Sequence, residues 1–181
     1  SRGLGDVYKR QVVDMAKNEH LFGYLKHCGG HYKVYLGDAR LEISKQPYKK
    51  YGAILSTVYW SSTVPFHLYT KEALDMYLSK LEDGGYFSII IPNHYFDFAP
   101  LFAAYNKTSP YKFHVIQEVG NPFFRTFVLK KEAEYMPPVD WQPLVDTGVE
   151  VWTDDFYNIF DVLKDPKNMR LTRDAKRFDL L

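Results

Sequence analysis

Long apolar runs separated by polar joints fill the stretch from Tyr32 to Pro92. One short apolar run ends at Gly37 and Asp38, a second begins at Tyr51, and a third follows the glycine pair Gly84–Gly85. Apolar runs closed by polar residues are typical of buried parallel strands. The pattern therefore predicts three such strands, each delivering polar residues at its carboxyl end.

A helix is predicted between the second and third runs. Thr70 is suited to be its N-cap, Glu72 follows in the first turn, and Gly84–Gly85 is expected to end it. Its apolar face carries Leu74, Tyr77, Leu78 and Leu81. Strand, helix and strand with short connections predict a parallel α/β sheet. Since ligands bind outside the carboxyl ends of such strands, Asp38 and the loop after Ser56 are the expected places for chemistry.

The rest of the chain gives shorter elements. Helical spacing of apolar residues predicts a helix from Val12 to His27 and another from Asp97 to Asn106. The runs FHVIQEV and RTFVLKK predict an antiparallel hairpin. In the closing block VWTDDFYNIFDVL, Thr153 or Asp154 is expected to cap a short helix.

Composition narrows the class of protein. The 181 residues are 46% hydrophobic and 17% aromatic, which suits one domain with a packed core. A net charge of +1 without a basic block gives no reason to expect nucleic acid. The single Cys28 excludes an internal disulfide and a cysteine-rich metal site, and no metal is expected. No apolar run approaches the ~20 residues of a membrane span. The lone cysteine suits a reducing compartment, and the expected location is the cytoplasm, or the cytoplasmic side of a membrane protein in the full-length parent.

The first eleven residues look foreign to the rest. Back-translated, SRGLGDVYKRQ gives DNA that resembles the end of a common transposon-based sequencing adapter. We therefore expect residues 1–11 to be a translated adapter, residues 12–164 a partial domain, and residues 165–181 a charged C-terminal tail. The alternative is a natural basic N-terminus.

Five sequence blocks, taken together and in order, carry a family resemblance. They are GDAR at Gly37–Arg40, SSTVPFHLYTKEAL at Ser61–Leu74, LxxGG at Leu81–Gly85, PNHYFDFAPL at Pro92–Leu101 and VWTDDF at Val151–Phe156. The set resembles the spermidine synthase-like (polyamine aminopropyltransferase) branch of the class I S-adenosylmethionine-dependent methyltransferase fold. It is most similar to bacterial members in which this domain is often joined to a multi-span, transporter-like membrane domain. The resemblance implies a Rossmann-like α/β fold, mostly parallel with a C-terminal antiparallel hairpin, that lacks its first strands.

The resemblance also implies a place for the donor. Gly37, Asp38 and Ala39 match the segment that holds the adenosine, where the Asp38 carboxylate accepts from the adenine amino group and the Ala39 N–H reads the ring. A second interpretation is that Asp38 caps a helix starting near Ala39, and both can hold together. The family's glycine-rich loop and ribose-binding acid should precede Val12. We expect them to be lost, so that this chain alone binds S-adenosylmethionine or its decarboxylated form poorly.

One departure from the family concerns catalysis. The family places an acid at the end of the strand before YWSST, where it positions and deprotonates the attacking amine. That position is Thr57 here, and threonine is no base near neutral pH. The alternatives are a shifted alignment or another acid that substitutes.

Further residues are candidates for binding the amine. Tyr59 and Trp60 would form an amine-facing wall. His67 matches a family position, although a histidine between apolar residues is more often structural. Asp154 and Asp155 could close over a polycation, and helix capping explains one of them equally well.

The expected function is transfer of an aminopropyl group from decarboxylated S-adenosylmethionine to a polyamine in the full-length parent, this chain alone being inactive. The alternatives are an S-adenosylmethionine-dependent methyltransferase, or a catalytically silent nucleoside- or polyamine-binding domain attached to a membrane protein. A homodimer and an upstream membrane domain are partners that the resemblance allows.

Overall fold

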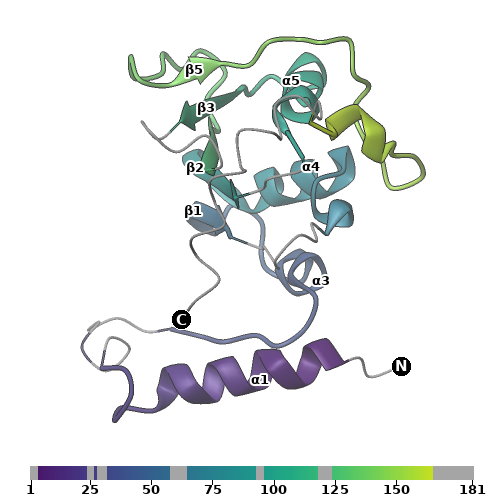
Figure 1. Ribbon diagram of the computed structural model, residues 1–181. Coiled ribbons are helices and arrows are strands. Elements are labelled where there is room, and N and C mark those ends of the chain that lie inside the picture. The colour runs from purple at the N-terminus through teal and green to yellow at the C-terminus, as the bar shows by residue number, and fades with distance from the viewer. Residues whose placement is uncertain are drawn as a thin grey trace, which may run out of the picture. The chain divides into compact units, whose positions relative to one another are not determined.

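The structure is a computed structural model that describes residues 4–23, 27, 32–57, 65–92, 96–117 and 124–164 (Figure 1). The chain divides into two compact units, Ser1–Gln46 and Pro47–Leu181. Each unit is treated separately below.

The first unit contains two described helices of different length, α1 (Leu4–Lys17) and α3 (Ala39–Ser44). Helix α1 ends ten residues before the predicted end at His27. The side chain of Asn18 explains this end, because its Oδ1 accepts from the N–H of His20 at 3.0 Å and so competes with the helical pattern. The helix also crosses the boundary at residue 12. That crossing does not test the adapter hypothesis, which stays a prediction.

The prediction of a strand before Gly37 is wrong. Residues 32–36 adopt no regular secondary structure. The side chains of Tyr32, Val34, Tyr35 and Leu36 are between 43% and 50% exposed. An apolar run becomes a strand only when a neighbouring strand completes its hydrogen bonds, and no described segment pairs with this one.

The second unit is built on a mixed sheet, which has five strands in the described part of the chain. Their order is β1 (Tyr51–Ser56), β2 (Leu81–Pro92), β4 (Phe124–Lys130), β3 (Phe113–Gln117) and β5 (Gln142–Pro143). Strands β1 and β2 are parallel, whereas β4 is antiparallel to both β2 and β3. Strands β1, β2 and β3 therefore run in one direction, with β4 reversed between the last two.

These directions confirm the predicted fold class, an α/β Rossmann-like methyltransferase fold with a C-terminal hairpin. The hairpin itself, predicted from two β-rich runs, is the β3–β4 pair. One detail differs from the expectation of a mostly parallel sheet, because three of the four described strand pairings are antiparallel and involve the hairpin. Its second strand lies inside the sheet, paired with β2 over seven residues.

Helices α4 (Lys71–Lys80) and α5 (Ala99–Thr108) pack on one face of this sheet (Figure 1). Tyr77 of α4 meets Phe87 at a ring distance of 5.3 Å, and Phe102 of α5 meets Phe127 at 4.6 Å. The predicted N-cap is confirmed, since Oγ1 of Thr70 accepts from the N–H of Ala73 at 3.4 Å. The core of the unit lies between this helical layer and the sheet.

The sequence analysis predicted that Gly84–Gly85 ends helix α4, and this prediction is wrong. The helix ends at Lys80, and Gly84 and Gly85 already belong to β2. A Cβ on Gly85 would lie 3.0 Å from the carbonyl oxygens of Glu82 and Gly52, and Gly84 has a φ of +81°. The pair therefore allows the irregular register by which β2 joins β1.

The C-terminal segment contains a different cap from the one predicted. Its helix is the short 3₁₀ turn η2 (Ile159–Val162), and Asn158 caps it by accepting from the N–H of Phe160 at 3.2 Å. Thr153 instead closes a turn with Phe156, whose N–H donates to the threonine Oγ1 at 3.1 Å. The tail over residues 165–181 lies outside the described residues. None of the helices that the structure describes is long and apolar enough to cross a membrane.

Candidate site at the carboxyl edge of the sheet

Several functional candidates meet at the carboxyl ends of the parallel strands in the second unit. Strand β1 ends at Ser56 and is followed at once by Thr57, which is exposed. The sequence analysis placed Thr57 at a strand end, and the structure does so. Its role as the substituted family acid stays a prediction.

A buried tyrosine lies behind this strand end. Tyr69 is almost fully buried, and burial raises the pKa of its phenol to about 12, while the Ser56 hydroxyl lowers it in part. Its ring lies 5.6 Å from that of Phe98. Because the phenol keeps its proton near neutral pH, Tyr69 is a packing group here and not a base.

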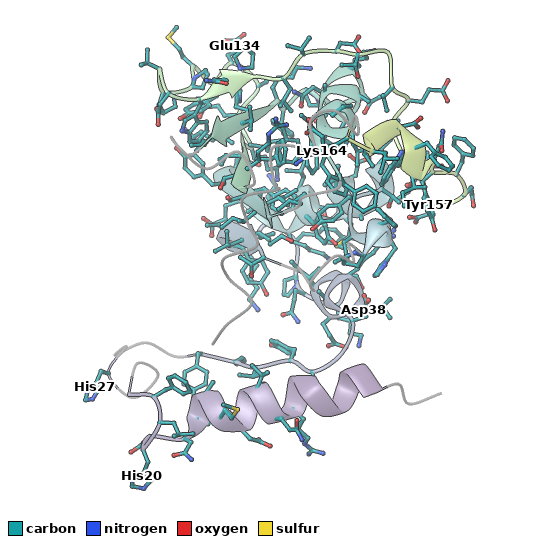
Figure 2. The ribbon with its side chains drawn as sticks, in the orientation of Figure 1. His20, His27, Asp38, Glu134, Tyr157 and Lys164 are labelled. Atoms are coloured by element: carbon teal, nitrogen blue, oxygen red, sulfur yellow. The ribbon has the colours of Figure 1, made fainter. Side chains whose placement is uncertain are left out.

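An aromatic cluster continues from Tyr69 towards the surface. We define it as Phe66, Phe96, Phe98, Trp152 and Tyr157. The ring of Phe66, on the 3₁₀ turn η1 (Phe66–Leu68), is its centre and lies between 5.5 and 6.5 Å from the other four rings. Phe98 and Trp152 are buried, whereas Tyr157 is 50% exposed and lies on the C-terminal segment in Figure 2. The cluster thus has an accessible aromatic edge.

Sequence reasoning missed this cluster. The wall predicted from Tyr59 and Trp60 lies outside the described residues. A signal was present in the VWTDDFY block, where Trp152 and Tyr157 flank the two aspartates that were singled out.

The two aspartates behave differently. Asp154 accepts a hydrogen bond from Thr70 Oγ1 at 2.7 Å, and its N–H donates to Glu72 at 3.0 Å. These bonds hold the C-terminal segment against the first turn of α4, a role different from the helix capping that the sequence analysis left open. Asp155 is exposed beside it. His67 is exposed on η1, so the structure gathers His67, Asp154 and Asp155 around the aromatic cluster without showing what they bind.

The predicted donor-binding residues belong to the first unit. Gly37 has a φ of +142°, a conformation that favours glycine. Asp38 caps helix α3, since its Oδ1 accepts from the N–H of Leu41 at 3.0 Å, and Ala39 is the exposed first residue of that helix. The capping interpretation is confirmed. Contact of Asp38 and Ala39 with adenine stays a prediction.

A second group of charged residues occupies the edge at the end of β2, and we call it the ion cluster: Asp97, Arg125 and Lys164. Asp97 Oδ1 pairs with Arg125 Nη1 at 2.5 Å and accepts from the N–H of Ala99 at 3.0 Å. Burial lowers the pKa of Lys164, Asp97 raises it, and Arg125 lowers it. Sequence reasoning could not find this cluster, because its members come from three distant segments.

Metal binding has no support in the described part of the chain. Among those residues, no group of three or more His, Cys, Asp or Glu side chains could hold a metal ion.

Comparisons with known proteins find similarity among solved structures. No protein-family model matches the chain, and no curated protein matches it. Among solved structures it is similar to MnmC2 from Aquifex aeolicus, with 17% sequence identity and a TM-score of 0.46. The similarity covers 72% of this chain and 46% of that one. A TM-score below 0.5 supports no argument about function, so the strand order and directions define the class: a Rossmann-like α/β domain of the methyltransferase type.

Proposed function

We propose that this domain belongs to a transferase that uses an S-adenosylmethionine-type donor and an amine acceptor. The specific form of the proposal is transfer of an aminopropyl group from decarboxylated S-adenosylmethionine to a polyamine. The observation that carries it is the aromatic cluster with Asp154 and Asp155, which stands at the edge where Rossmann-like sheets bind ligands.

The chemistry of this edge suits a polyamine. Such a molecule alternates ammonium groups with short apolar linkers, so it needs aromatic faces and carboxylates together. Tyr157 offers an accessible ring, and Asp155 offers an exposed carboxylate two residues away. The predicted contacts of Tyr59, Trp60 and His67 with the amine belong to the same proposal.

A silent binding domain is the second candidate function. It is favoured by Thr57, which brings no carboxylate to the end of β1, and by Tyr69, whose phenol pKa of about 12 makes it unsuitable as a base. A methyltransferase on the same fold is the alternative that keeps catalysis. A homodimer and an upstream membrane domain stay predictions.

Calorimetric titration of the purified chain with putrescine tests the acceptor half of the proposal. Tyr157→Leu removes the exposed ring and should weaken binding about two- to fivefold, the size of one exposed cation–π contact. Phe160→Leu is the matched control, because Phe160 is exposed on the same segment but lies outside the aromatic cluster. Equal effects of the two variants, or no putrescine binding, would contradict the proposal.

A chain that carries the glycine-rich loop, which the resemblance implies before Val12, tests the donor half of the proposal. Preference of that chain for decarboxylated S-adenosylmethionine supports aminopropyl transfer, and preference for S-adenosylmethionine supports methyl transfer. Binding of putrescine with neither donor would leave the silent domain.

A further inference from the structure

We propose that a cavity beside Arg125 is a binding pocket for a small molecule that carries a carboxylate on an apolar body. The cavity has a volume of about 270 Å³ and lies between the start of α5, strands β3 and β5, and residues 144–147. This inference does not rest on the transferase proposal, and a pocket with a cation in its wall disfavours a polyamine.

Arg125 is held in a fixed position at this cavity. Its Nη1 pairs with Asp97 Oδ1 at 2.5 Å. Asp97 is itself fixed, because the same oxygen accepts from Ala99 and its backbone N–H donates to the carbonyl of Val162 at 2.7 Å. An anchored guanidinium loses little conformational entropy on binding, which is the condition for tight recognition of a planar anion.

Arg125 also has an N–H donor that bonds to none of the described residues. A guanidinium carries five N–H donors. Its bond to Asp97 uses Nη1, and its Nε is buried without a hydrogen-bond partner among the described residues. The side chain remains 29% exposed, and part of it lines the cavity. A carboxylate in the cavity would accept from the terminal nitrogens of Arg125, the pairing that this group favours.

The rest of the wall determines the remainder of the ligand. Six of its ten described lining residues are apolar, among them Pro100, Val115 and Leu144, and Asp97 is the only acid among the ten. Val145 is 75% exposed, so the cavity is open to solvent on that side. The apolar part contacts an aliphatic or aromatic body better than a polar one.

The neighbouring Lys164 agrees with this charge preference. It lines a smaller cavity whose wall also includes Asp97 and Arg125, and Figure 2 labels it on the second unit. Burial lowers its pKa and Arg125 lowers it further, against the opposing effect of Asp97. Both cations of the ion cluster would be stabilised by an added negative charge.

Titration of the purified chain with 4-methylpentanoate, followed by NMR, tests the pocket. We expect saturable binding of the acid and at least tenfold weaker binding of 4-methylpentanamide, which has the same body without the charge. Arg125→Gln should weaken binding of the acid about tenfold or more. Asp97→Asn should strengthen it, because the competing carboxylate is removed while an oxygen that can accept from Arg125 remains.

The matched control is Lys49→Gln. Lys49 is also in an ion pair, with Asp83 at 2.6 Å, but does not line the cavity, so its loss should leave binding unchanged. If Arg125→Gln fails to fold, the acid-to-amide ratio and Asp97→Asn still decide. Equal binding of acid and amide, weaker binding in Asp97→Asn, or no saturable binding of the acid would overturn the proposal.

Discussion

Two apolar runs of similar length, residues 32–36 and strand β1, have opposite outcomes. Strand β1 pairs with β2 over most of its length, whereas residues 32–36 form no strand. Burial does not distinguish the two runs, since Leu55 in β1 is 62% exposed. This is more than the exposed fraction of Tyr32, Val34, Tyr35 or Leu36. The difference is that β1 has a neighbour and a following helix, α4, that delivers this neighbour. An apolar pattern therefore indicates a candidate strand, and pairing with a neighbouring strand determines whether the strand forms.

The largest effect is expected when the packing of helix α5 against the sheet is removed. Phe102 is fully buried, with ring distances of 4.9 Å to Phe113 and 4.6 Å to Phe127. Phe102→Ala should lower the free energy of unfolding by about 3–5 kcal/mol, measured by urea denaturation. A loss below about 1 kcal/mol would show that the second unit is not stabilised by this layer.

A smaller effect is expected where β2 joins β1. Gly85→Ala places a Cβ against two carbonyl oxygens at 3.0 Å and should cost about 2 kcal/mol. Gly84→Ala is the control, because its Cβ meets nothing within 4 Å and only its φ of +81° is strained, at a cost of about 1 kcal/mol. If the two variants unfold at the same denaturant concentration, close approach at Gly85 is not what shapes the join.

A pH effect of similar size is expected from Tyr69, which packs behind β1. The pKa of its phenol is 10.0 when unperturbed and about 12 in the fold, so the unfolded state binds fewer protons between these values. Its contribution is fully present below pH 10.0 and is lost as the pH rises to about 12, a change of about 2–3 kcal/mol. Tyr69→Phe should show a shallower loss of stability over this range in denaturation curves. An unchanged pH dependence would be evidence against burial of the phenol.

The smallest effect is expected in the run that forms no strand. Leu36→Ser replaces a side chain that is 48% exposed, so the stability should change by less than about 0.5 kcal/mol. Leu74→Ser, at a fully buried position of α4, is the contrasting variant and should be strongly destabilising. A loss above about 1 kcal/mol for Leu36→Ser would break the comparison, because it would mean that residues 32–36 are packed in solution.

Local signals predicted what local interactions determine. Helix α4, its cap at Thr70 and the β3–β4 hairpin depend on residues close together in sequence, and all three are confirmed. The sequence analysis misread Gly84–Gly85 as a helix stop. Glycine is needed at position 85 because the carbonyl oxygen of Gly52, more than thirty residues earlier in the sequence, approaches it closely.

The candidate site was predicted less completely. Amine binding by Asp154 stays a prediction, and its observed bond to Thr70 was not predicted, because it joins residues 84 positions apart. The Asp97–Arg125 pair spans 28 positions and follows from the insertion of β4, which no periodicity in the sequence announces. Such contacts depend on the order and direction of the strands in the sheet, which the pattern of a single sequence does not reveal.

The reversed strand β4 has a consequence for how this protein is made. Strand β2 ends at Pro92, but its partner β4 is complete only at Lys130, 38 residues later. At about 5–20 residues per second, a ribosome needs roughly 2–8 s to supply those residues. During that interval the nascent chain carries an unpaired, strongly apolar strand edge, which can pair with another chain. Synthesis speed over residues 93–130 and the presence of a chaperone are therefore expected to influence the yield of this protein.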